Sequence, residues 1–195
     1  MRRVLFISHP NVVVSREVPV PQWPLSSIGR NRMAASLVQP WIPDISAVYC
    51  STEQKSIDSA EVLARHLSLN IQPVNDLGEN DRSSTGFLSP EEFEQVADQF
   101  FAAPYDSVRG WETAFVAQQR IVGAVNELAK VDRTSGTIAV VSHGAVGTLL
   151  YCYLSGYPIS RRWDQPSNCG GNFYSFQLDP AQVFSWWKPI DEIAL

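Results

Sequence analysis

The stretch VLFISHP, residues 4–10, decides which fold this sequence predicts. It is a nearly continuous apolar run, typical of a strand covered on both faces of a sheet, followed by Ser-His and then by a proline that ends the strand. The same order returns in IAVVSHG, residues 138–144, where a glycine takes the last place. Since each run delivers a histidine to the end of a buried strand, we expect His9 and His143 to lie at one edge of one sheet.

Apolar strands alternate with helical patterns along most of the chain. Strands are expected at residues 4–8, 47–51, 71–74 and 137–142, with two more, able to form a hairpin, at 172–178 and 183–187. Helices are expected at residues 26–37, from 52 to at least 67, from 89 onward, at 112–130 and at 145–154. This alternation predicts an α/β layered fold with a mostly parallel central sheet. Ligands of such sheets bind beyond the carboxyl ends of the strands, where both Ser-His pairs are placed.

Two of these helices begin at side chains that can cap them. Thr52 follows the second strand and is expected to be an N-cap. Ser89-Pro90-Glu91-Glu92 has an N-cap serine, a proline at the first helical position and a glutamate at the third. Together these residue types predict a capping box.

Composition and charge exclude several classes of protein. With 195 residues the chain is large enough for one domain with its own core. Its net charge of −5 and its lack of a Lys/Arg block argue against a partner nucleic acid. No apolar stretch approaches the length of a membrane span, and the run after the basic start is too short for a signal peptide. Cys50, Cys152 and Cys169 are odd in number and widely spaced, so we expect a reducing, cytoplasmic compartment.

A pair of histidines at one site suggests three chemistries. A metal site would need further ligands, but the sequence has neither H-E-x-x-H nor a cysteine cluster. A serine hydrolase would need G-x-S-x-G, which is absent. The third chemistry is a histidine nucleophile that accepts a phosphoryl group beside a second histidine, with nearby cations and a carboxylic acid for the leaving oxygen. The remaining histidine, His66, lies near a predicted helix C-terminus and is interpreted as structural.

Six segments, taken in order, resemble the histidine phosphatase, or phosphoglycerate mutase-like, superfamily over nearly the whole chain. They are Ser8-His9-Pro10, Pro24 to Gly29, Tyr49 to Ser56, Leu77-Gly78-Glu79, Gly110-Trp111-Glu112 and Val140 to Gly144. The last is the most specific, since it is close to the family's Val-x-His-Gly. The resemblance implies a three-layer α/β/α fold with a mostly parallel sheet in a single domain, residues 1–195. Residues 77–111 would form a cap or specificity segment.

The resemblance also implies roles for individual residues. His9 would be the phosphorylated nucleophile, and His143 would bind the transferring phosphoryl group. Glu79 would act first as general acid and then as the base for water. Lys55 would supply positive charge, and the backbone N–H of Gly144 would donate to the phosphoryl group, as helix N-termini do for anions. Neither a metal nor a cofactor is expected.

The sequence departs from the family at the residues that hold phosphate. Ser8 stands where the family has its first arginine, and Lys55 stands at the second. Arginine grips two phosphate oxygens at once, whereas lysine is a point charge and serine is neutral. Pro10 replaces the third hallmark residue and removes a backbone donor. The arginines that could fold in as replacements are Arg16, Arg30, Arg82 and Arg109.

Among these arginines, Arg82 is the strongest candidate because it lies on the segment that carries Glu79. Its alternative is an exposed ion pair with Asp81 or a neighbour. Ser8, Lys55, Arg82 and Gly144 are therefore the predicted substrate-binding residues.

Two functions from different classes follow. The first is a phosphomonoesterase that forms a phosphohistidine on a small phosphorylated substrate and is slowed by its altered clamp. The second is a weak or inactive relative that binds an anion or a protein partner in the same pocket. Retention of His9, His143 and Glu79 favours the enzyme, and loss of both arginines favours the binder. A mutase would use the same residues, so the sequence does not separate it from a phosphatase.

Two further segments each allow more than one interpretation. DQPSNCGG, residues 164–171, could line the pocket, but a turn of the chain is the simpler interpretation. Trp186-Trp187 suits the core, or a contact between two copies in a homodimer, better than a binding platform.

Overall fold

Four parallel strands form one side of a single sheet in the computed structural model, which describes residues 2–192. They are β1 (Arg3–Ser8), β2 (Ile45–Cys50), β3 (Ile71–Pro73) and β4 (Thr137–Ser142), in the spatial order β3-β2-β4-β1. The register pairs Ser8 with Ser142, so β1 and β4 end side by side. This confirms the prediction that these two strands are parallel neighbours.

The other side of β1 carries the antiparallel part of the sheet. β5 (Asn172–Leu178) pairs with β1, and both β6 (Ala181–Val183) and β7 (Lys188–Pro189) pair with β5. The strand expected at residues 183–187 is therefore wrong, because the hairpin partner of β5 ends at Val183 and the chain then leaves the sheet. After this point Trp187 packs edge-on against Tyr174 in the core, at 4.7 Å between ring centroids. Trp186 is exposed, so only one tryptophan of this pair belongs to the core.

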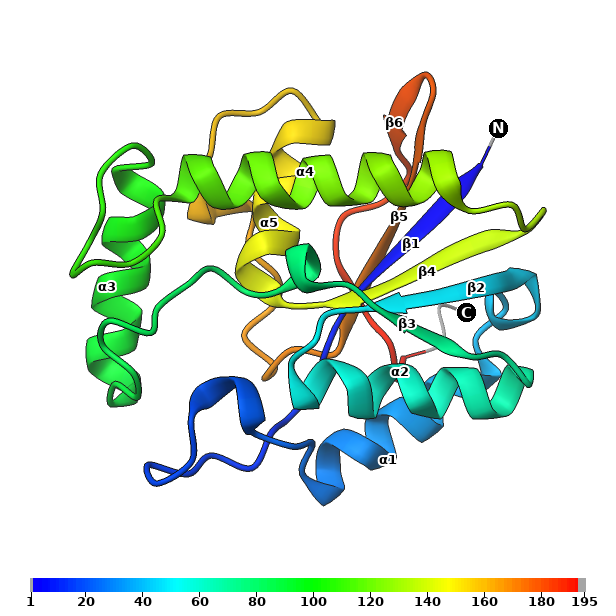
Figure 1. Ribbon diagram of the computed structural model, residues 1–195, viewed down its shortest axis with the longest axis horizontal. Coiled ribbons are helices and arrows are strands. Elements are labelled where there is room, and N and C mark those ends of the chain that lie inside the picture. The colour runs from blue at the N-terminus through cyan, green and yellow to red at the C-terminus, as the bar shows by residue number, and fades with distance from the viewer. Residues whose placement is uncertain (1, 193–195) are drawn as a thin grey trace.

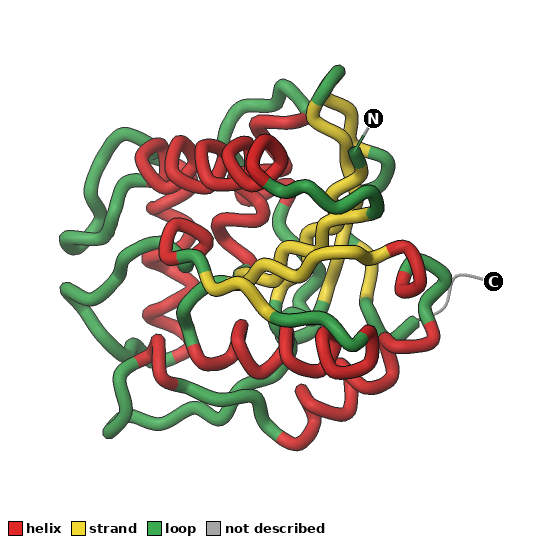
Figure 2. Tube along the Cα trace, turned by 45° about the vertical axis from the view of Figure 1, so that its right-hand side comes forward, coloured by secondary structure: helices red, strands yellow, loops and turns green. Residues whose placement is uncertain are grey.

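Helices cover both faces of the sheet, which gives the three predicted layers (Figures 1 and 2). α1 (Ser27–Ala35) and α2 (Gln54–Leu67) cover one face. α4 (Ala114–Val131) and α5 (Gly144–Leu154) cover the other, and α3 (Pro90–Ala102) stands at the outer end of this layer. Short 3-10 helices lie at Val20–Gln22 (η1), Ser36–Val38 (η2), Ile42–Asp44 (η3), Asn75–Leu77 (η4) and Arg161–Trp163 (η5). Within residues 2–192, no helix combines the length and apolarity that crossing a membrane requires.

The two predicted helix caps have different outcomes. The capping box at Ser89 is confirmed, with the Ser89 side chain accepting from the N–H of Glu92 and the Glu92 side chain accepting from the N–H of Ser89. Thr52 is not a cap, because α2 begins two residues later, at Gln54. Residues 51–53 turn the chain from β2 into α2. The Thr52 hydroxyl therefore lies outside the helix, where it donates to Asn75 Oδ1 at 3.4 Å.

The segment from Asn11 to Pro24, between β1 and α1, contains η1 and is anchored at the start of α1. Ser26 caps α1, and its backbone N–H donates to the carbonyl of Asn11 at 3.0 Å. A Cβ on Gly29 would lie 2.2 Å from the same carbonyl oxygen. Only glycine permits this approach, so Gly29 brings the loop that follows His9 against the first turn of α1.

Candidate active site

His9 and His143 meet where β1 and β4 end. Their ring centroids are 5.1 Å apart and the ring planes are 72° from parallel. The backbone N–H of His9 donates to the carbonyl of Ser142 at 3.0 Å, which ties the two strand ends together. The rings therefore lie within the width of one phosphoryl group, as the repeated Ser-His pattern predicts.

The ring of His9 has one nitrogen engaged by the backbone of the next residue. Nδ1 lies 2.9 Å from the carbonyl oxygen of Pro10. A carbonyl can only accept, so Nδ1 carries the proton and the lone pair is on Nε2. Burial, followed by the positive charge of Lys55, lowers the pKa of His9 to about 4. The imidazole is thus neutral at neutral pH, as a nitrogen nucleophile must be. Pro10 lacks the donor of the family's glycine but keeps the carbonyl that sets this tautomer.

His143 is fully buried at the N-cap of α5. Its Nε2 lies 2.7 Å from Ser51 Oγ and 3.3 Å from Glu53 Oε1, whereas Nδ1 has no hydrogen-bond partner among residues 2–192. Burial lowers the pKa of His143 well below its ordinary value. An unpaired buried nitrogen is costly, and an oxygen of a bound ligand would remove that cost.

Glu79 is held at the N-terminus of α5. Its carboxylate accepts from the N–H groups of Ala145 at 3.2 Å, Val146 at 3.1 Å and Asn80 at 3.0 Å. Burial raises the pKa of Glu79, although the charge of Arg82 and these hydrogen bonds oppose the shift. The structure thus brings Glu79 to the helix that His143 caps. Gly144, the first residue of that helix, has an N–H that no carbonyl within the helix can accept.

The predicted cation Lys55 is already paired. It is 2% exposed, and its ammonium group donates to the Val20 carbonyl at 2.9 Å and to the carboxylate of Glu53. Burial lowers the pKa of Lys55, and the charge of Glu53 opposes this shift. The positive charge at this position is therefore offset before any anion arrives.

Arg82 lies beside the pocket without an ion pair among the described residues. Its guanidinium carbon is 4.8 Å from the centre of the Phe93 ring, and its charge reaches both histidines and Glu79. The expected alternative, a pair with Asp81, is not formed within residues 2–192. The other candidate arginines are placed elsewhere: Arg16 over Phe87, Arg30 in an ion pair with Asp58, and Arg109 at the surface.

Ser8 is buried and is bonded inside the protein. Its hydroxyl donates to Gln165 Oε1 at 2.6 Å and accepts from the N–H of Asn172 at 3.1 Å. Gln165 belongs to the glycine-containing segment 164–171, which turns the chain and also contacts the histidine pair. A Cβ on Gly170 would lie 2.2 Å from the carbonyl oxygen of His9, so the segment turns the chain against the backbone of His9, and none of its residues lines the cavity described next.

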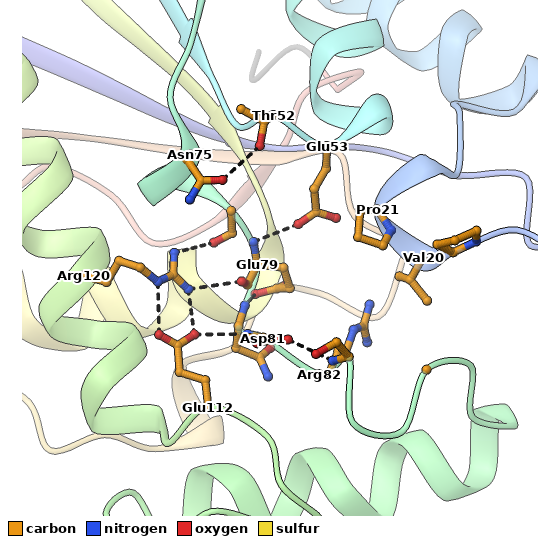
Figure 3. A pocket seen from close by; sticks show the side chains of 15 residues that line it. Val20, Pro21, Thr52, Glu53, Asn75, Glu79, Asp81, Arg82, Glu112 and Arg120 are labelled. Atoms are coloured by element: carbon orange, nitrogen blue, oxygen red, sulfur yellow. Dashed lines mark hydrogen bonds and ion pairs between the residues drawn. The ribbon is translucent and has the colours of Figure 1, made fainter.

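A cavity of about 590 Å³ opens beside Glu53 and Glu79, and neither His9 nor His143 is among the residues that line it (Figure 3). Its walls come from the loop at residues 19–21, from Thr52 and Glu53 at the start of α2, and from much of the segment 75–86. Figure 3 shows Glu53, Glu79 and Arg82 around this space. The predicted specificity segment 77–111 thus contributes directly to the wall.

Arg120 of α4 fixes the segment that carries Glu79. Its guanidinium donates to the carbonyls of Asp76 and Gly78 at 2.9 Å each and of Glu79 at 3.1 Å. It also forms a bidentate pair with Glu112, at 3.1 and 2.8 Å (Figure 3). Helical periodicity places residue 120 beside the apolar stripe but cannot indicate which distant backbone it contacts.

Sequence reasoning also missed Glu53 and Gln165. Glu53 lies two residues before Lys55, in the segment whose serine and lysine resemble the family pattern. That short spacing is the only sequence feature that could have indicated a pair between Glu53 and Lys55. Gln165 had no signal of its own beyond its place in the glycine-containing turn.

Comparison with known proteins identifies relatives of this architecture. The sequence profile of the Histidine phosphatase superfamily (branch 1) matches residues 17–187, a range that begins after His9. Bacillus stearothermophilus YhfR has a TM-score of 0.78 and 20% identity, with 100% of this chain and 98% of that chain covered. No curated protein matches this sequence.

Two further solved structures have similar coverage. Mycobacterial glucosyl-3-phosphoglycerate phosphatase in complex with inorganic phosphate has a TM-score of 0.76 and 16% identity, covering 98% of this chain and 100% of that chain. Phosphoserine phosphatase from Entamoeba histolytica in complex with 3-phosphoglyceric acid has a TM-score of 0.74 and 16% identity, covering 96% and 98%. At these identities the structures establish the shared fold.

Proposed function

Because the chain belongs to the histidine phosphatase superfamily, we propose that it hydrolyses small phosphate monoesters through a phosphohistidine on His9. The observation that carries this proposal is the neutral His9 ring, with Nδ1 hydrogen-bonded to the Pro10 carbonyl and its centroid 5.1 Å from that of His143. The similar mycobacterial phosphatase, which was captured with inorganic phosphate, supports a phosphorylated ligand.

In the proposed first step, Nε2 of His9 attacks the phosphorus atom. The bond between phosphorus and the ester oxygen breaks, and Glu79 gives its proton to the departing oxygen. The raised pKa of Glu79 supports this role, because a general acid must hold a proton near the working pH. The N–H of Gly144 faces the developing charge on the phosphoryl oxygens, and His143 Nδ1 donates to them only when it carries a proton.

In the second step, the Glu79 carboxylate takes a proton from water, which attacks the phosphohistidine and releases phosphate. The same intermediate would serve a mutase if the product alcohol, rather than water, took the phosphoryl group. We assign the choice of ester to residues 77–111, because residues 78–83 and Gly86 line the cavity. The chemistry requires neither metal nor cofactor.

A second function, anion binding with little turnover, is favoured by one observation. Lys55 is paired with Glu53, and the Ser8 hydroxyl is bonded to Gln165, so both positions that replace arginine are occupied by internal contacts. Loss of one strong donor to a transition state typically costs about 2.7–4 kcal/mol. We therefore expect turnover to be slow.

The test is a turnover assay on a panel of aryl and alkyl phosphates with a chelator present. The wild-type protein should show slow hydrolysis and an acid-labile, base-stable phosphate on the protein. His9→Ala should lose both, whereas His66→Ala, which changes an exposed histidine of α2, should lose neither. If the protein binds phosphate but shows neither turnover nor trapped phosphate, the proposed phosphatase function is rejected and anion binding is supported.

A further inference from the structure

The amide oxygen of Gln165 is held by two donors. Oε1 accepts from Ser8 Oγ at 2.6 Å and from Asn172 Nδ2 at 2.9 Å. Asn172 is fully buried and Ser8 is 1% exposed, so this part of the network is fixed inside the protein. Since both neighbours donate to oxygen, the orientation of the amide follows, and the Nε2 end turns away from them.

The Nε2 end of Gln165 lies against the peptide that follows His143. An added Cβ on Gly144 would be 2.2 Å from Nε2, so any side chain there would displace the amide. Within residues 2–192, Gln165 Nε2 donates no hydrogen bond. One residue therefore connects Ser8, which precedes His9, with Gly144, which follows His143, and it keeps two N–H donors without a partner.

Apart from Arg82, whose charge reaches both histidines, the groups around the histidine pair leave a phosphoryl group short of donors. The charge of Lys55 is offset by Glu53, and the Ser8 hydroxyl donates its hydrogen bond to Gln165 Oε1. Three groups at or beside the peptide that joins His143 to Gly144 have no hydrogen-bond partner among residues 2–192: the Gln165 Nε2 group, the Gly144 N–H and His143 Nδ1. A carboxamide offers hydrogen bonds without a full charge, so it can stand beside neutral histidines without lowering their pKa further.

We propose that Gln165 is a substrate-binding residue that donates Nε2–H to an oxygen of the phosphoryl group, with Ser8 and Asn172 as the positioning residues that hold its oxygen. This assignment rests on the proposed phosphoryl site between His9 and His143. In this chain a neutral amide would then hold the phosphoryl group where an arginine is expected. Ser8 at the carboxyl end of β1 and Asn172 at the start of β5 orient that amide.

The test compares two substitutions at Gln165 by the dissociation constant for inorganic phosphate, measured by calorimetry without turnover. Gln165→Leu keeps the size but removes both donors, and it should weaken binding about tenfold, the effect of one good hydrogen bond. Gln165→Glu also adds a negative charge and should weaken binding more. The matched control is Gln182→Leu on β6, at the far edge of the sheet, which should bind as the wild type does. Wild-type affinity in both Gln165 variants would overturn the assignment.

A second measurement on the unmodified protein covers the case in which the variants do not fold. The side-chain NH₂ resonances of Gln165, assigned in the ¹⁵N-labelled protein, should shift on titration with phosphate and should saturate with the calorimetric constant. Unshifted resonances at saturation, or no phosphate binding at all, would overturn the assignment.

The outcomes separate this assignment from the proposed function. Binding that depends on Gln165 in a protein without turnover would support the assignment and reject the enzyme. Turnover with unchanged phosphate affinity in both Gln165 variants would support the enzyme and reject the assignment of Gln165.

Discussion

Glu53 forms an ion pair with Lys55 beside the two histidines, and both side chains are largely buried. The other carboxylate oxygen of Glu53 accepts from the backbone N–H of Glu79 at 3.0 Å. Burial alone would raise the pKa of Glu53, but His143, then the charge and hydrogen bond of Lys55, and the N–H of Glu79 together lower it to about 2. A permanent negative charge therefore stands next to the place where we expect an anion.

Glu53→Gln should strengthen phosphate binding by roughly tenfold, because removal of a nearby like charge is commonly worth about 1–2 kcal/mol at partly buried sites. The glutamine oxygen can still accept from the N–H of Glu79, so the backbone contact is kept. The control is Glu61→Gln on the same helix, where the carboxylate pairs at the surface with Arg65. Equal or weaker binding by Glu53→Gln would show that Glu53 does not oppose the anion.

Arg120 should be a positioning residue for Glu79. Arg120→Lys keeps the charge but loses the fork that reaches three carbonyls, so we expect kcat to fall about tenfold or more with little change in KM. The basic limb of the pH profile should also move, because Glu79 would change its surroundings. Arg120→Met should in addition lower the free energy of unfolding by about 3 kcal/mol, since it leaves Glu112 unpaired. A stability loss with an unchanged pH profile would assign Arg120 a structural role alone.

Glu79→Gln should distinguish substrates by their leaving groups. A poor leaving group needs a proton as it departs, whereas an activated aryl oxide does not, so turnover of alkyl phosphates should fall by roughly 10²–10⁴ and that of nitrophenyl phosphates much less. The measurement is kcat/KM for a series of esters that spans the pKa of the leaving alcohol. Equal losses across the series would mean that Glu79 does not protonate the leaving oxygen.

The acidic limb of the pH–activity profile should lie at a pH far below the ordinary pKa of histidine. Burial and then Lys55 lower the pKa of His9 to about 4, so the neutral nucleophile persists until the pH falls to about that value. The limb should appear in kcat/KM, which reports the free enzyme. An acidic limb at pH 6–7 would show that the ring is more hydrated than this structure indicates.

Stability should also decrease with acid in a defined range. An unfolded histidine binds its proton near pH 6.5, whereas folded His9 does so only near pH 4, so the unfolded state binds more protons in between. The stability contributed by the neutral ring is thus complete above about pH 6.5 and is lost as the pH falls toward 4. The shift corresponds to no more than about 3 kcal/mol. Urea unfolding as a function of pH measures it, and His9→Asn should flatten the curve over this range.

The local patterns that predicted the fold depend on neighbouring residues. The apolar runs at the starts of VLFISHP and IAVVSHG specify buried parallel strands, and strands of that kind pair with their carboxyl ends together. The capping box at Ser89 likewise involves residues only three apart. Such contacts form within a few residues, so their residue types can be recognised without a partner from elsewhere in the chain. This is why the meeting of His9 and His143 could be predicted, while the start of α2, which depends on a turn, was misplaced.

The clamp around the phosphoryl site was decided only by the tertiary structure. Ser8 and Gln165 are 157 positions apart, and Arg120 reaches carbonyls more than 40 positions before it. Even the pairing of Lys55 with Glu53, two residues away, depends on burial against Val20, since exposed neighbours of this kind gain little from each other. The sequence alone determined which strands would carry the histidines. Which donors face them was determined by packing, because an amide, a hydroxyl or an ammonium group bonds to whatever acceptor the folded chain brings within 3 Å.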